Sequence, residues 1–272
     1  MKLVKALLIA LFMPLAAFSS IAAPEVKKVD FSRGDGPYRE DDFARDFGRF
    51  SSENSLTSIE NQALCITFPK GKKIEGLRGA LVSVAPRDNY VLEFRIKYPK
   101  NFEDGLHGKQ FGLTGGAGYT GGRGEEARTN GDGWSVRLQF DAHGGKITHQ
   151  LYVYHADMKG KYGESLGTEK QRITLCRDQW HTIRLKVTMQ SLPDKADGLI
   201  EVWEGGVRRI KIDRIHFVRK KSGCEVSRIA LEAFCGGAGI IPTHDNTVRV
   251  DDICWWSDPP DPIRYQTSLS ND

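Results

Sequence analysis

Three polar side chains occupy alternate positions of the stretch W-S-V-R-L-Q-F, residues 134–140. Because side chains of an extended strand alternate between its two faces, Ser135, Arg137 and Gln139 share one face, and the apolar residues share the other. An arginine fork beside a hydroxyl and an amide can bind a carboxylate through parallel hydrogen bonds. A polar row on one isolated strand is usually only solvated, so its neighbours decide what it does.

Two further stretches supply polar residues that could join this row. L-Y-V-Y-H at 151–155 places Tyr152 and Tyr154 on one face, and G-L-H-G-K at 105–109 does the same for His107 and Lys109. D-A-H-G-G-K at 141–146 has the composition of a hairpin turn, so the arginine row and the tyrosine row are expected on adjacent strands. Phenol rings that face water usually have something to stack on or to donate to.

Such a set suits β-elimination on a polymer of uronic acids. The sugar's C5 proton becomes acidic once its carboxylate is neutralised by an arginine or a lysine. A base then removes that proton, and an acid gives one to the departing glycosidic oxygen. Tyrosine can take either role, and we expect Lys109 and Arg137 to lower its pKa from the usual value of about 10. The chemistry requires no metal and no organic cofactor.

Other chemistries are less well supported. G-A-G-Y-T-G at 116–121 matches the dinucleotide fingerprint, but that motif needs a helix behind its strand, and here the sequence predicts a long flexible loop beside a cleft. Glu201 and Glu204 would point to opposite faces of a strand, and Glu232 stands alone in its strand, so a glycosidase pair is not indicated. No G-x-S-x-G nucleophile elbow occurs.

Metal binding has little support from the histidines. His143, His149 and His155 do not match a zinc signature, and even spacing across a turn and a strand would not bring them together on one ion. A structural calcium ion near Asp245 and Asp251 stays open, because carboxylates in sandwich loops can hold one. We therefore expect no catalytic metal.

The elements that must position these residues are strands. In Y-V-L-E-F-R-I-K-Y at 90–98 the apolar and charged residues take opposite faces, namely Leu92, Phe94, Ile96 and Tyr98 against Glu93, Arg95 and Lys97. Stretches at 149–155, 181–189, 199–203, 207–217, 227–234 and 247–256 repeat the pattern, with turn-rich segments between them. Many strands with one wet face predict an all-β fold, an antiparallel two-sheet β-jelly roll or concanavalin-like sandwich. We expect a single domain over 23–256 and a polar tail over 257–272.

The N-terminus is typical of a secretory signal peptide. Lys2 and Lys5 precede an apolar run, small residues follow, and cleavage after Ala22 would remove residues 1–22. No other segment is long and apolar enough to span a membrane, so we expect a secreted or periplasmic protein. Hydrophobic residues at 39% and charged residues at 27% exclude a disordered chain. The formal charge of +4 loses two lysines on cleavage, so the chain is only mildly basic.

The chain has five cysteines, Cys65, Cys176, Cys224, Cys235 and Cys254. In an exported protein they allow at most two disulfides and leave one thiol over, and their spacing does not determine the pairing. No C-x-x-C pair is present, which argues against a zinc site. We expect partial disulfide bonding and one buried thiol.

Taken in order, the motifs resemble polysaccharide lyase family 14, the alginate and glucuronan lyases with a β-jelly-roll fold. The resemblance runs from about residue 90 to residue 256. It comprises a G-x-K segment before a Gly-Gly loop, W-S-x-R, Y-x-Y, W-H-T-I-R-L, D-G-L-I-E-V-W-E-G-G and a late F-C-G-G. The resemblance implies a catalytic cleft made by Lys109, Ser135, Arg137, Tyr152 and Tyr154.

Within that cleft we assign Arg137, helped by Ser135, to the uronate carboxylate, and Lys109 with one tyrosine to the proton transfers. His107 and Gln139 are expected to contact the substrate. The sequence departs from the family pattern after the lysine, where Gln110, Phe111 and Gly112 replace the usual Leu-Pro-Gly. This departure bears on which polymer fits.

The sequence thus predicts an exported polysaccharide lyase that acts on a polyuronate. The alternative is a lectin-like module that binds acidic polysaccharide without cleaving it, since Q-W-H-T-I-R-L and D-G-L-I-E-V-W also resemble concanavalin-like and laminin-G-like sandwiches. A third class is a structural or envelope-stress protein that uses the fold for protein contact. The expected partner is an acidic polysaccharide rather than a nucleic acid, and the expected state is a monomer. The choice between mannuronate, guluronate and glucuronate stays open.

Overall fold

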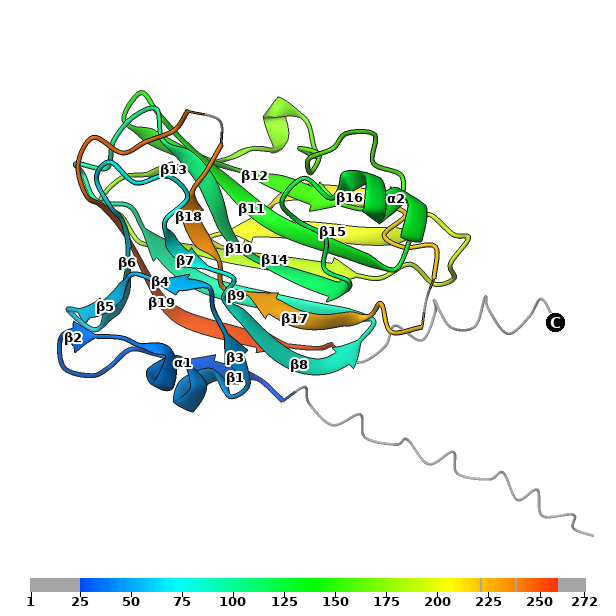
Figure 1. Cartoon of the computed structure of the whole chain (residues 1–272), viewed down its shortest axis with the longest axis horizontal. Coiled ribbons are helices and arrows are strands. Elements are labelled where there is room, and N and C mark those ends of the chain that lie inside the picture. The colour runs from blue at the N-terminus through cyan, green and yellow to red at the C-terminus, as the bar shows by residue number, and fades with distance from the viewer. Residues whose placement is uncertain (1–24, 221, 238, 259–272) are drawn as a thin grey trace, which may run out of the picture.

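The computed structural model describes residues 25–220, 222–237 and 239–258 (Figure 1). The predicted signal peptide and most of the predicted tail lie outside these residues. Within them, the strands form two sheets, and every pairing between named strands is antiparallel. The prediction of an all-β, antiparallel two-sheet sandwich is therefore confirmed.

The nine-stranded sheet contains, in spatial order, β16 (Val207–Ile215), β15 (Gly198–Glu204), β14 (His181–Thr188), β9 (Asn89–Lys97), β19 (Asn246–Trp256), β6 (Ala63–Phe68), β5 (Thr57–Glu60) and β2 (Gly36–Pro37), with β1 (Lys27–Val29) beside β19. The ten-stranded sheet contains β13 (Ile173–Cys176), β12 (Lys146–Tyr154), β11 (Gly133–His143), β10 (His107–Gly116), β17 (Val226–Ala230), β8 (Leu81–Arg87) and β3 (Phe50–Ser51). To this sheet also belong β18 (Ala233–Cys235), which pairs with β10 and with β7 (Gly76–Arg78), and β4 (Asn54–Ser55), which pairs with β7.

The core lies between the two sheets, as the alternating sequence predicted. The apolar side chains of β9 point inward and are fully or almost fully buried, together with those of β10, β11 and β14. Phe94 of one sheet packs against Phe111 of the other, with ring centroids 5.0 Å apart. Each such side chain stabilises the fold by about 1.5–3 kcal/mol through its removal from water. The polar faces of the two sheets therefore point outward.

The β11–β12 hairpin fixes the relative position of two predicted site rows. Its turn is Gly144-Gly145, and both glycines have positive φ, as the tight turns that match strand twist require. The resulting register pairs Ser135 with Tyr154 and Arg137 with Tyr152. The prediction that these rows lie side by side is confirmed.

A β-bulge interrupts the strand that carries the predicted lysine. Lys109 pairs with Gln139, but Gly112 pairs with Arg137, so β10 uses three steps where β11 uses two. The extra residue leaves both Gln110 and Phe111 fully buried on the core side. As a result, Lys109 and Gly112 lie on the same outer face, which strict alternation would not allow.

Two short helices accompany the sheets, α1 (Glu40–Phe47) and α2 (Gly124–Asn130), and a 3₁₀ turn spans Glu169–Gln171. The prediction of a long flexible loop here is wrong in part, since α2 forms within this segment and is capped by Gly131 in the left-handed conformation. The dinucleotide motif nevertheless lacks its context, because the strands around it are antiparallel. Neither helix in the described part is long and apolar enough to cross a membrane.

All five cysteines lie within the described residues, and all five are free thiols. The expectation of partial disulfide bonding is therefore not met. The strand register explains this for four of them, because none faces another cysteine: Cys65 pairs with Arg249, Cys176 with Lys146, Cys235 with Gly108, and Cys254 with Glu93.

Candidate active site

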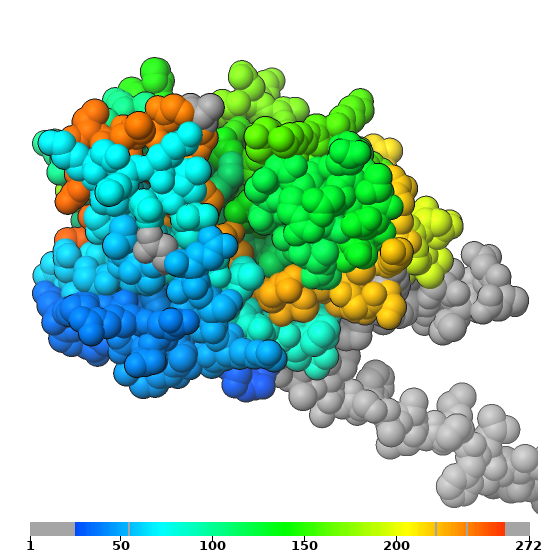
Figure 2. Space-filling model, in the orientation of Figure 1, coloured from blue at the N-terminus to red at the C-terminus, as the bar shows by residue number. Residues whose placement is uncertain are grey.

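The outer face of the ten-stranded sheet is hollowed. Figure 2 shows the hollow between the lobe that contains β7, in cyan, and the lobe that contains α2, in green. β10, β11 and β12 run between these lobes (Figure 1). The predicted site residues come from these three strands, so the sheet brings them to one face.

Arg137 lies at the centre of this face and is almost completely buried, with 4% of its side chain exposed. Its Nη1 donates to Oε2 of Glu232 at 2.7 Å, while its Nε is buried and has no hydrogen-bond partner among the described residues. The arginine crosses Gly112, where a Cβ atom would come within 2.8 Å of the arginine's Cγ. Glycine is thus required beneath the arginine stem.

Lys109 lies beside Arg137 and above the face of Tyr152. Its Nζ is 3.3 Å from the centroid of the Tyr152 ring and donates to Oε1 of Gln139. Burial lowers the pKa of Lys109 from 10.5 to about 7, and the positive charge of Arg137 acts in the same direction. A large share of this amine is therefore unprotonated near neutral pH, which a general base requires.

Tyr152 is half-buried and keeps its proton. Its hydroxyl oxygen accepts a hydrogen bond from the backbone N–H of Gly163 at 3.0 Å. The expectation that nearby cations lower the pKa of this tyrosine is wrong: burial, followed by repulsion from Tyr154, raises it well above 10 and outweighs the opposing effect of Arg137. Tyr152 is consequently suited to donate a proton.

The other two predicted catalytic residues are enclosed. Tyr154 is fully buried, and its hydroxyl accepts from the backbone N–H of Gly122 at 2.9 Å. Ser135 is 1% exposed, and its hydroxyl donates to the carbonyl oxygen of Tyr119 at 2.6 Å. Both groups therefore hold the segment that follows β10 against the sheet. In this structure their polar atoms bond to that segment.

The two predicted substrate contacts lie in the same row as Lys109. Gln139 is opposite Lys109 on the neighbouring strand and accepts its hydrogen bond. His107, two residues before Lys109, packs against the backbone after β18, since a Cβ at Gly237 would lie 2.2 Å from His107 Nε2. The structure therefore brings all seven predicted site residues to one face of the sheet.

Two residues of this site escaped the sequence-based prediction. Glu232 was considered only as half of a carboxylate pair, although it is the partner of Arg137. Gly163 was not considered, although a Cβ at this position would lie 2.6 Å from the Tyr152 ring. Neither contact leaves a local pattern. Glu232 and Arg137 are 95 residues apart, and Gly163 lies in a loop whose sequence has no periodicity.

The possible metal ligands of the described residues do not gather into a site. No group of three or more His, Cys, Asp or Glu residues in the described ranges is arranged to hold one. Of the two residues considered for calcium, Asp245 accepts a hydrogen bond from the backbone N–H of Lys70, and Asp251 lies 3.6 Å from Arg95.

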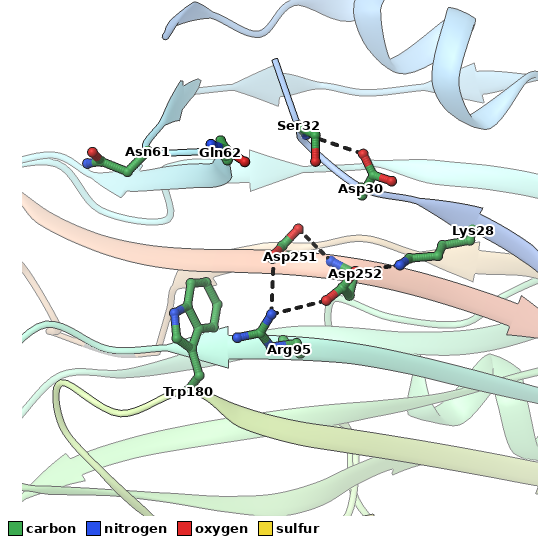
Figure 3. Close-up of a pocket in the computed structure, with 9 residues that line it drawn as sticks. All are labelled: Lys28, Asp30, Ser32, Asn61, Gln62, Arg95, Trp180, Asp251 and Asp252. Atoms are coloured by element: carbon green, nitrogen blue, oxygen red, sulfur yellow. Dashed lines mark hydrogen bonds and ion pairs between the residues drawn. The ribbon is translucent and has the colours of Figure 1, made fainter. Parts of the chain in front are cut away.

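A second hollow, of about 420 Å³, lies on the outer face of the nine-stranded sheet (Figure 3). Four of its five charged residues form ion pairs, Arg95 with Asp251 and Asp252, and Lys28 with Asp252 at 2.7 Å. The fifth, Asp30, accepts a hydrogen bond from the backbone N–H of Ser32. The Arg95 guanidinium also stacks on Trp180, 4.9 Å from a ring centroid. These contacts tie β1 to β9 and β19, so the hollow is a structural ion-pair network.

Comparison with known proteins relates this fold to a group of enzymes. The sequence model described as polysaccharide lyase 14 matches residues 58–246. The alginate lyase Aly36B is similar in structure, with a TM-score of 0.76 and 21% identity over 86% of this chain and 97% of that one. The alginate lyase vAL-1 from Chlorella virus has a TM-score of 0.60 and 19% identity over 75% of this chain and 89% of that one.

The marine PL-14 alginate lyase from Aplysia kurodai is also similar, with a TM-score of 0.54 and 21% identity over 82% of this chain and 96% of that one. At these identities the similarity concerns the fold. No curated protein matches the chain in sequence at a significant level.

Proposed function

The chain belongs to polysaccharide lyase family 14, and from this we propose that it cleaves a polyuronate of the alginate or glucuronan type by β-elimination. The observation that carries the proposal is the contact of Lys109 with Tyr152, an amine with a lowered pKa against a phenol with a raised one. The two groups thus differ in the direction that a base and an acid need.

Lys109 is the general base. Its unprotonated amine takes the C5 proton of the uronate, and the electron pair of the broken C–H bond forms the double bond between C4 and C5. The same electrons expel the glycosidic oxygen from C4. Because Nζ is also fixed by Gln139, the lone pair has a defined direction.

Tyr152 is the general acid. Its hydroxyl gives its proton to the departing glycosidic oxygen, which leaves as an alcohol, and the backbone N–H of Gly163 stabilises the phenolate that forms. The Lys109 ammonium formed in the same step then lies over the face of the ring, where a cation is attracted.

Arg137 binds the uronate carboxylate. Negative charge accumulates on this carboxylate as the C5 proton leaves, so a positive group next to it stabilises the transition state more than the bound substrate. Nη2 of Arg137 has no hydrogen-bond partner among the described residues and is not enclosed as Nε is, so it is the donor that the carboxylate would reach. Ser135 and Tyr154 support the reaction indirectly, by holding the segment over the sheet.

The structural neighbours support the choice of substrate. Aly36B, vAL-1 and the Aplysia kurodai enzyme are alginate lyases. A variant of Aly36B with one lysine and one tyrosine replaced by alanine has been described in complex with an alginate tetrasaccharide. For this chain, the proposed proton-transferring pair is a lysine and a tyrosine, Lys109 and Tyr152. We further propose that the protein is exported through residues 1–22, acts as a monomer and uses no cofactor.

The test is incubation of the purified protein with polymannuronate, polyguluronate and glucuronan, followed by the ultraviolet absorbance of the unsaturated product. We expect product from at least one polymer. Retention of a polymer in an affinity gel without product from any of them would favour the lectin-like alternative. Lys109→Ala serves as the inactive control for contaminating lyases.

A further inference from the structure

The carboxylate of Glu232 joins two segments at the centre of the site. Its Oε2 accepts from Arg137 Nη1 at 2.7 Å, and its Oε1 accepts from the backbone N–H of Gly79 at 3.2 Å. Only 14% of the side chain is exposed. Glu232 follows β17 and precedes β18, and the neighbouring Leu231 donates its N–H to the carbonyl of Ala80. Both its oxygens are therefore engaged, and its backbone is held.

The hydrogen bond that Arg137 Nη1 donates to Glu232 is the one hydrogen bond made by this guanidinium within the described residues. The aliphatic stem of the arginine is confined by Gly112, and the guanidinium carbon lies 5.9 Å from the centroid of the Tyr152 ring. Neither contact determines how the planar guanidinium is rotated. Glu232 does, because its hydrogen bond with Nη1 orients the planar group and leaves Nη2 without a partner among the described residues.

Resting on the proposed function, we propose that Glu232 is a positioning residue that holds the guanidinium of Arg137 with its free Nη2 directed at the uronate carboxylate. The guanidinium then shares its donors between two carboxylates, one from the protein and one from the substrate. Since the arginine is held before the sugar binds, little of its side-chain entropy is lost on binding.

This role predicts a specific kinetic signature. Without Glu232 the guanidinium can rotate, so its contact with the carboxylate weakens most where the charge is greatest, in the transition state. For Glu232→Ala we expect kcat to fall about 10²-fold with KM changed by less than about threefold. Glu232→Gln, which keeps an acceptor for Nη1, should recover part of this loss.

The decisive experiment is a double-mutant cycle on the polymer that the wild type cleaves. If Glu232 acts only through Arg137, then Glu232→Ala costs no further activity in an Arg137→Lys background, where the fork is already absent. A further loss similar to that in the wild-type background would overturn the proposal, because Glu232 would then act on its own or through the fold.

Two controls keep the result interpretable. Glu201→Ala removes an ion pair of the same length, 2.7 Å to Arg208, on the other sheet, and should leave kcat unchanged. Thermal unfolding of each variant identifies loss of fold, and Glu232→Gln replaces Glu232→Ala in the cycle if the alanine variant does not fold. A wild type that cleaves no polyuronate would contradict the proposed function, whereas an active wild type with an unchanged Glu232→Ala variant would contradict only the role of Glu232.

Discussion

Lys109 and Tyr152 face each other across two strands that do not pair, with Nζ 3.3 Å from the ring centroid. β11 lies between their strands and contributes Arg137 and Gln139 to the same face. Burial shifts the two pKa values in opposite directions: it lowers the pKa of the Lys109 amine and raises the pKa of the Tyr152 phenol. Both shifts favour the neutral form of the group. The site thereby holds a base without a proton and an acid with one.

The pKa of Lys109 determines the pH dependence of activity. A general base must be unprotonated, and burial brings the pKa of this amine down to about 7, so activity should be lost as the pH falls below 7. We expect kcat/KM to decrease about tenfold per pH unit on this acidic limb and to level off above it. Lys109→Arg, which stays protonated, should be inactive throughout. An acidic limb near pH 10 would mean that the lysine is not desolvated in the working enzyme.

Removal of the Tyr152 hydroxyl should affect chemistry more than binding. Tyr152→Phe retains the ring under Lys109 but cannot donate a proton, so we expect a loss of about 10²- to 10⁴-fold in kcat. Binding of an unsaturated oligouronate, measured by calorimetry, should be retained. Tyr90→Phe is the control, because it removes a buried hydroxyl that donates to Ala85 outside the site. Equal losses in the two variants would count against an acid role for Tyr152.

Gly163 offers a test of how closely Tyr152 is positioned. A methyl group at this position would lie 2.6 Å from the ring and must displace it, so Gly163→Ala should lower kcat at least about tenfold. Gly160→Ala is the matched control in the same loop, since its nearest neighbour would be 3.4 Å away. Neither glycine has positive φ, so backbone strain does not distinguish them. Similar kcat values for the two variants would contradict the tight contact.

Arg137 should contribute to both activity and stability. Arg137→Ala leaves Glu232 without its partner in a site where both side chains are largely buried, and we expect a loss of about 3 kcal/mol in the free energy of unfolding. Turnover should fall at least about 10²-fold. Arg184→Ala, which breaks a more exposed pair with Glu93 on the other sheet, should cost at most about 1 kcal/mol and no activity. Urea unfolding and initial rates check both statements.

The exposure of each free cysteine predicts how fast its thiol reacts. Cys176 is exposed, Cys254 is partly exposed and the other three are buried, with burial raising the pKa of Cys65 and Cys235 to about 12. In the native protein we expect one rapidly reacting thiol and a slower second one. All five should react in denaturant without a reducing agent. Fewer thiols in denaturant would indicate a disulfide.

Much of the fold could be predicted from local sequence. Alternation in Y-V-L-E-F-R-I-K-Y and W-S-V-R-L-Q-F assigns each side chain to the core or to the outer face, because a strand has a period of two. The Gly-Gly turn at 144–145 then sets the register that pairs Arg137 with Tyr152. These features depend on residues close together in the chain, so the sequence by itself determined them.

What each site residue can do was decided by the tertiary structure. Glu232 reaches Arg137 from 95 residues away, and the segments after β10 and β12 cover Tyr154 and bond to Tyr152. Burial of Lys109 lowers its pKa, and burial of Tyr152 raises its own, against the sequence-based expectation. Desolvation depends on everything packed around a group, and no local pattern of residues encodes it. The sequence therefore placed the polar residues of β10, β11 and β12 on one face of the sheet. Only the tertiary structure distinguished the base Lys109 and the acid Tyr152 from the buried residues Ser135 and Tyr154.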